Sequence, residues 1–183
     1  MVDLSQDSVH NAIYNGIKRG ISVAMDNQCY GSAVILLLSG IDAMAYLGMS
    51  PGQQDVTRQD FIAWAERYIH FDGKEQLTGA DLYGARCAML HSYGVRSRMS
   101  RSGECRIVGY MSEAYPPVQY NPAISTELVM VSVPALRDAV FKGIDDFLIF
   151  LYSNPAKAKL ADERLRNFVH MIPFEKGQEG REP

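Results

Sequence analysis

Residues 77–101, LTGADLYGARCAMLHSYGVRSRMSR, have the strongest structural pattern in this sequence of 183 residues. They predict one long helix followed by a basic loop. Thr78 and Asp81 have the spacing of a capping box, in which two side chains bond free backbone amides at a helix start. Gly94 marks the expected end, since glycine readily adopts the left-handed conformation that closes many helices. We therefore predict the fold around a helix over residues 78–94.

This predicted helix is apolar on almost every side, which is typical of a helix buried in a core. Arg86 and His91 nevertheless lie within it, and a buried guanidinium is costly unless it is paired or faces water. Two interpretations stay open. In the structural one, Arg86 pairs with Asp42, the one charged residue of the apolar segment 32–47, and His91 is a hydrogen-bonded core residue. In the functional one, Arg86 and His91 meet an anion.

Composition limits the classes of function. The net charge of −3 disfavours nucleic-acid binding by bulk electrostatics, so contact with RNA would need a local patch. Cys29, Cys87 and Cys105 are an odd set without framework spacing, and we interpret them as reduced thiols of a cytoplasmic protein. The N-terminus lacks the pattern of a signal peptide, and the longest aliphatic run, 33–38, is far shorter than the about 20 residues that span a bilayer. We expect no membrane segment.

Hydrophobic periodicity predicts a mainly α fold with a minor β element. Short connections between the first four helices favour an up-and-down helical bundle. The β-branched runs 106–111 and 128–133, separated by a proline-containing loop, predict a small antiparallel β-hairpin or an extended arm inserted before the C-terminal helices. The helices are expected over residues 5–24, 32–47, 57–71, 78–94, 134–153 and 156–170.

The length of the chain predicts a single domain over residues 1–174. Its expected parts are a four-helix core (1–94), a basic loop with the β-arm (95–133) and the C-terminal helices (134–171). The polar composition of residues 175–183 predicts a disordered tail.

An R-x4-H pattern runs from Arg86 to His91 near the end of the predicted helix. Together with the preceding Asp-Leu-Tyr at 81–83 and the apolar segment 32–47, SAVILLLSGIDAMAYL, it resembles the HEPN superfamily (higher eukaryotes and prokaryotes nucleotide-binding domains). The resemblance covers about the first half of the chain. HEPN proteins are helical bundles, and their nuclease branch carries an arginine and a histidine at this spacing. Cys87 stands where active members often have a polar residue after the arginine.

The resemblance implies a metal-independent endoribonuclease that cleaves single-stranded RNA by 2′-OH transphosphorylation at a dimer interface, without a cofactor. Arg86 and His91 would be catalytic, and Asp42 and Tyr83 would orient them. An imidazole titrates near neutrality and can transfer protons, while a guanidinium offers a planar fork to a phosphate. A two-fold axis would supply a second acid–base group. The expected partners are a second copy, RNA, and a protein partner such as an antitoxin.

Two further interpretations stay open beside the nuclease. One is a non-catalytic HEPN-like module that binds nucleotide, RNA or a protein partner, and the other is a structural adaptor. Geometry also raises an objection to catalysis, because positions five apart lie about 140° apart around an ideal helix. Arg86 and His91 converge only if the helix end opens into a cleft or the arginine side chain bends round.

The basic residues after the helix form a second candidate region. Arg96, Arg98 and Arg101 are predicted to bind RNA phosphates, together with Arg106. Single-stranded RNA is the expected form, since its bases can stack on exposed aromatic rings such as Tyr93. The alternative is a solvated loop.

The cysteines offer two other chemistries. Cys87 and His91 share a helix face and could form a thiolate–imidazole pair, but no third orienting group is evident. Cys87, His91 and Cys105 match no zinc-binding spacing. We therefore predict no metal site.

Overall fold

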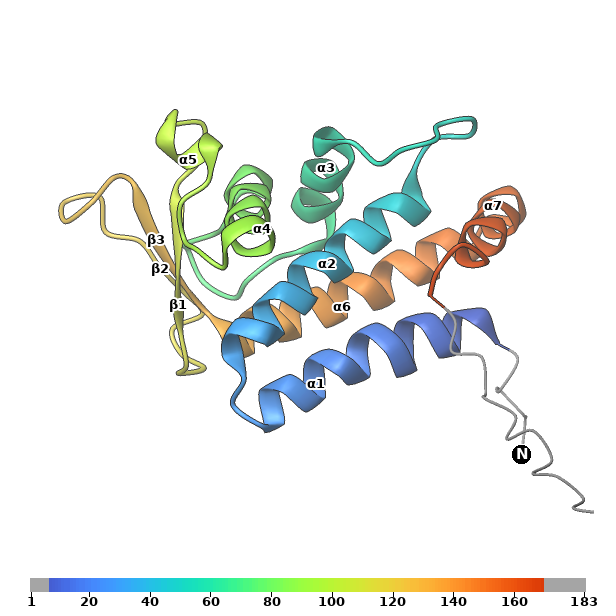
Figure 1. Ribbon diagram of the computed structural model, residues 1–183, viewed down its shortest axis with the longest axis horizontal. Helices are drawn as coiled ribbons and strands as arrows, with labels where there is room; N and C mark the ends of the chain where they lie inside the picture. The colour runs from blue at the N-terminus through green and yellow to red at the C-terminus, as the bar shows by residue number, and fades with distance from the viewer. Residues whose placement is uncertain (1–6, 170–183) are drawn as a thin grey trace, which may run out of the picture.

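The computed structural model describes residues 7–169 and shows a mainly helical protein with one small sheet (Figure 1). The predicted mainly α fold class is confirmed. The predicted helix start at residue 5 and the tail 175–183 lie outside the described residues. The helices are the π-helix η1 (His10–Lys18), α1 (Arg19–Asp26), α2 (Tyr30–Gly48), α3 (Arg58–Tyr68), α4 (Gly79–Ser92), α5 (Arg98–Arg101), α6 (Val133–Tyr152) and α7 (Pro155–Leu165). The strands are β1 (Ile107–Met111), β2 (Val118–Gln119) and β3 (Leu128–Ser132).

Helix α2 lies at the centre of the fold, in contact with α1, α3, α4, α6 and α7. Leu37, Ile41 and Met44 in its middle are fully buried. Figure 1 shows α1 and α6 beside α2, whereas α3 and α4 lie across it at a steep angle. The regular up-and-down bundle predicted for the first four helices is therefore not seen, because the helix that runs alongside α1 and α2 is α6.

The same helix is apolar enough, by length and composition alone, to cross a bilayer. Its mean hydropathy reaches 1.6, and half of that stretch is buried inside the fold. A core helix meets the same criterion. The contacts of α2 with six other helices, η1 included, are typical of such a core helix.

A buried arginine attaches α7 to the end of α2. Arg164, only 6% exposed, donates from Nη1 to the carbonyl oxygens of Leu47 at 2.9 Å and Met49 at 2.6 Å, and from Nη2 to that of Ser50 at 2.9 Å. These carbonyls lie at the C-terminus of α2, where the helix dipole is negative. The C-terminal helices therefore complete the same hydrophobic core as residues 1–94.

Replacing Arg164 with methionine is expected to lower the free energy of unfolding by about 3 kcal/mol. The change keeps the length of the side chain but leaves several buried carbonyls of α2 without a donor, each of which carries a desolvation penalty. Equilibrium urea unfolding would measure this, with Arg166→Met as the control, because Arg166 is an exposed residue of the same C-terminal region. Equal stability of the two variants would show that the arginine does not hold α7 in place.

Helix α4 begins as predicted. Thr78 is its N-cap, and the reciprocal capping box with Asp81 is present. The helix ends at Ser92, and Tyr93 adopts the left-handed conformation, with φ of 51°. The left-handed residue that closes the helix is therefore one position earlier than the predicted Gly94. The Gly94 amide does donate to the carbonyl of Ala88, at 3.2 Å.

The sheet differs from the predicted hairpin. Strands β1 and β3 are parallel, with Ile107 opposite Leu128, and β2 pairs antiparallel with β3, with Val118 opposite Val131. The order across the sheet is β1-β3-β2. The antiparallel hairpin is wrong because the proline-containing loop carries a short strand of its own, so the chain reverses twice between β1 and β3.

An ion pair between the buried Asp81 and the partly exposed Arg106 connects the start of α4 to the start of β1. Asp81 is 1% exposed and accepts from the backbone amide of Arg106 at 2.8 Å and from its Nη2 at 2.5 Å. Arg106 also donates to the carbonyl of Gln76 at 2.9 Å and packs over the ring of Tyr120. Arg106, which was predicted to collect phosphates in a basic loop, is therefore paired with Asp81, with its side chain 20% exposed.

Stability is expected to fall in acid through Asp81. Burial alone would raise the pKa of this carboxyl, but hydrogen bonds from Arg106 and Thr78 outweigh burial and hold its pKa below the usual value. Its contribution to stability is therefore fully present above the ordinary carboxyl pKa of about 4 and is lost as the pH falls through the lower folded-state value. Urea unfolding as a function of pH should show a shallower acid decline for Asp81→Asn than for the wild type. An identical decline would assign the acid sensitivity to other groups.

Candidate functional site

One face of α4 reaches the surface, although the sequence predicted a fully buried helix. Tyr83, Arg86 and Cys87 are partly exposed, and Leu90 and His91 are exposed. We call these five residues the α4 face. The opposite side of the helix is buried against α2 and α3. Although α4 is largely apolar in composition, Arg86 and His91 are both accessible on its surface.

Arg86 is paired with Asp42 of α2, as the structural interpretation predicted. Its Nε donates to Oδ2 of Asp42 at 2.8 Å, and the two side chains are 26% and 20% exposed. Burial disfavours the charge of Arg86, but the hydrogen bond and the negative charge of Asp42 outweigh burial and raise its pKa. Asp42 thus keeps the guanidinium of Arg86 charged and holds it in a half-buried position, although the pair as a whole is neutral.

The head group of Arg86 lies between Asp42 of α2 and the ring of Tyr83. Its guanidinium carbon is 6.0 Å from the ring centroid of Tyr83, and it also interacts with the side chain of Cys87. Tyr83, Cys87 and His91 follow one another at intervals of four, so they share one side of the helix. Tyr83, which lies beside Arg86, therefore shares a side of α4 with His91, although no hydrogen bond joins Arg86 to His91 within residues 7–169.

Tyr83 is held in place by its surroundings. Its ring makes an edge-to-face contact with Phe61 of α3, with centroids 5.3 Å apart. Burial, and then the neighbouring thiol of Cys87, raise the pKa of Tyr83, so its hydroxyl stays neutral. Tyr83 therefore presents a neutral, aromatic ring to the guanidinium of Arg86, and the orienting role that the resemblance gives it stays a prediction.

His91 lies in the last turn of α4 and is exposed. Across the described part of the chain it has no hydrogen-bond partner. The interpretation of His91 as a hydrogen-bonded core residue is therefore wrong. An accessible imidazole can meet a ligand or a second copy of the chain, but one chain brings only one such ring to the α4 face.

The basic region after α4 contains a helix that the sequence analysis missed. Ser97 caps α5, and Ser100 completes a capping box of the same type as those of α3 and α4. Arg96, Arg98 and Arg101 are exposed, so they remain available for phosphates. The Ser-x-x-Ser spacing was a signal that could have located α5.

Sequence reasoning also missed Arg58, the first residue of α3. Its guanidinium carbon lies 6.0 Å from the centroid of Tyr83, and its Nη2 donates to Glu104 at 2.9 Å. Arg58 and Arg86 therefore both contact the ring of Tyr83. No local pattern places residue 58 near residue 83, because their proximity depends on how α3 packs on α4.

The cysteines show no catalytic or metal-binding arrangement. The Sγ of Cys105 lies so close to Gly84 that any side chain there would overlap it, and burial raises the pKa of this thiol. Among residues 7–169, no group of three or more His, Cys, Asp and Glu side chains is placed to hold a metal ion.

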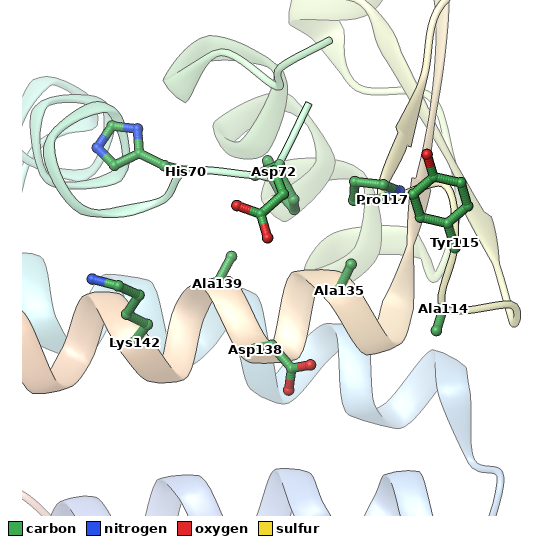
Figure 2. Close-up of a pocket in the computed structure, with 10 residues that line it drawn as sticks. His70, Asp72, Ala114, Tyr115, Pro117, Ala135, Asp138, Ala139 and Lys142 are labelled. Atoms are coloured by element: carbon green, nitrogen blue, oxygen red, sulfur yellow. The ribbon is translucent and has the colours of Figure 1, made fainter. Parts of the chain in front are cut away.

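A separate pocket of about 350 Å³ lies between α6, the end of α3 and the β1–β2 connection (Figure 2). His70, Asp72, Tyr115 and Lys142 are among its lining residues. Figure 2 shows the carboxylate of Asp72 turned toward α6 and that of Asp138 turned away from the hollow. None of the residues singled out by the sequence lines this pocket.

No protein-family model, no curated protein and no solved structure matches this chain. The accessible histidine and the fixed guanidinium of the α4 face are the features on which we base a function.

Proposed function

We propose that this protein is a HEPN-like endoribonuclease that cleaves single-stranded RNA without a metal ion and acts as a homodimer. The observation that carries the proposal is the position of the Arg86 guanidinium. Held by Asp42, it lies 6.0 Å from the ring of Tyr83, which shares a side of α4 with the exposed His91. This arrangement places a permanent cation and a proton-transfer group on one accessible surface.

These two residue types match the needs of transphosphorylation. The ribose 2′-oxygen attacks the adjacent phosphorus and loses its proton to a base, while the 5′-oxygen of the next nucleotide leaves and takes up a proton from an acid. The products are a 2′,3′-cyclic phosphate and a 5′-hydroxyl. His91 would transfer one of these protons, and Arg86 would stabilise the charge that develops on the phosphate oxygens.

A second copy of the chain would complete the site. In-line transphosphorylation needs both a base and an acid, and one α4 face offers a single imidazole. Leu90 and Tyr93, which are 36% and 64% exposed, place apolar surface next to His91. A two-fold axis near these residues would bring two Arg86–His91 pairs together without further sequence.

The proposal is tested by incubating the purified protein with mixed single-stranded RNA in EDTA. The wild type is expected to cleave, and Arg86→Ala and His91→Ala are expected not to. Light scattering of the same samples should give the mass of a dimer. If the RNA stays equally intact with the wild type and with both variants, the proposed nuclease activity is wrong.

The ion pair between Arg86 and Asp42 favours a second candidate, a non-catalytic module that binds RNA or nucleotide. A carboxylate already neutralises the guanidinium, and Cys87 replaces the polar residue that active HEPN members often have. Three results together would favour this candidate. The wild type binds RNA without cleaving it, the binding weakens as the salt concentration rises, and Arg98→Ala and Arg101→Ala reduce the binding.

A further inference from the structure

The ring of Tyr83 lies within 6.0 Å of two guanidinium carbons, those of Arg58 and Arg86. The two arginines come from different helices, α3 and α4, and each is held by one carboxylate. Asp42 holds Arg86, and Glu104 holds Arg58. Because Phe61 fixes the ring, the two guanidinium groups are supported on one rigid aromatic platform.

The surroundings of Arg58 do not satisfy all the hydrogen-bond donors of its guanidinium. Its Nε is buried and has no hydrogen-bond partner among the described residues, although its side chain as a whole is 41% exposed. Arg58 is also the first residue of α3, where the positive end of the helix dipole disfavours a cation. A cation that lies at an unfavourable position and has 41% of its side chain exposed is well suited to an anionic ligand.

Glu104 connects Arg58 to the basic region. It accepts from Arg58 at 2.9 Å and from the hydroxyl of Ser102 at 2.6 Å, and Arg98 is close enough to act on its charge. Arg86, Arg58 and Arg98 are therefore connected through Tyr83 and Glu104, and Asp42 and Glu104 are the counter-ions of the first two. The cationic side chains at the two ends belong to the candidate catalytic and RNA-binding sets.

We infer that Arg58 binds a second phosphate of the same RNA strand whose scissile phosphate lies at Arg86. This inference rests on the proposed function. The two guanidinium carbons are separated by no more than twice 6.0 Å, so neighbouring phosphates of one strand could contact both. The substrate class is therefore an oligonucleotide that occupies several phosphate positions, and a dinucleotide would be a poor substrate.

The test compares Arg58→Gln with the wild type on two substrates, a single-stranded RNA of about 12 nucleotides and a dinucleoside monophosphate. Loss of the second phosphate contact should raise KM for the longer RNA about tenfold and leave kcat nearly unchanged. KM for the dinucleotide should not change, since it lacks the second phosphate. Fluorescence anisotropy of the longer RNA should show the same weakening, with the salt slope reduced by about one.

Two variants control the measurement. Arg58→Lys keeps the positive charge and should restore most of the affinity. Arg67→Gln removes a cation from the same helix, but from a guanidinium that packs 4.4 Å from the ring of Phe150, away from Tyr83, and it should change nothing. Circular dichroism would confirm that each variant is folded.

The outcomes separate the two proposals. If Arg86→Ala impairs binding or cleavage of RNA but Arg58→Gln impairs neither, the proposed role of Arg58 is overturned. The proposed nuclease activity is not affected by that result. If the wild type neither binds nor cleaves either RNA, the proposed function fails and the role of Arg58 fails with it.

Discussion

Replacing His91 with alanine is expected to lower the rate of RNA cleavage by about 100-fold to 10,000-fold, the usual contribution of a positioned proton-transfer group. The loss should be in kcat, because an exposed ring without hydrogen bonds contributes little to the fold or to ground-state binding. For the same reason the free energy of unfolding should change by less than about 0.5 kcal/mol. Single-turnover cleavage of labelled RNA and urea unfolding of the same preparation would measure both quantities.

His70→Ala is the matched control for this prediction. His70 is also exposed, but it lies in the separate pocket beside α6. Cleavage should be unchanged in this variant. A folded His91→Ala protein that cleaves RNA as fast as His70→Ala would remove His91 from the mechanism.

Asp81→Ala is expected to lower the free energy of unfolding by about 3–5 kcal/mol. The substitution removes the Asp81 half of the α4 capping box and leaves Arg106, whose side chain is only 20% exposed, without its carboxylate partner, which is the costly way to break such a pair. Asp81 is 1% exposed, so water cannot replace the lost bonds without a rearrangement. Equilibrium urea unfolding monitored by circular dichroism would measure the change.

Asp60→Ala provides the comparison, because Asp60 forms the equivalent capping box of α3 with Thr57 and has no arginine partner. It should cost about 1 kcal/mol. The double variant Asp81→Ala/Arg106→Ala should lose less than the sum of the two single variants, since the unpaired charge is gone. If Asp81→Ala cost no more than Asp60→Ala, the ion pair would not stabilise the fold.

The sequence was most informative where structure depends on nearby residues. The cap of α4, from Thr78 to Asp81, and the extent of α6, bounded by Pro134 and Pro155, follow from local backbone chemistry and are confirmed. The pairing of Arg86 with Asp42 was also predictable, because each is the only charge in the body of its apolar helix.

Features that depend on distant packing were not predictable from the sequence. Strand β2 has only two residues, too few for a recognisable pattern, and without it the parallel pairing of β1 and β3 could not be foreseen. Arg106 resembled the neighbouring exposed arginines, and only the fold shows that it meets Asp81, which lies 25 residues earlier in the chain.

The exposure of α4 was misjudged for a related reason. The composition of a helix shows how apolar it is, but how much of the helix is buried depends on how many neighbouring elements cover it. Helices α2 and α3 cover only part of α4 and leave Arg86 and His91 accessible. The proximity of Arg58 to Tyr83 follows from the same packing.

The most direct test of the central proposal is the chemical identity of the RNA ends. After incubation of single-stranded RNA with the wild-type protein in EDTA, mass spectrometry should find new fragments ending in 2′,3′-cyclic phosphate, and His91→Ala should produce none. Intact RNA with the wild type, or fragments that end in a 3′-hydroxyl, would contradict a metal-independent reaction at Arg86 and His91.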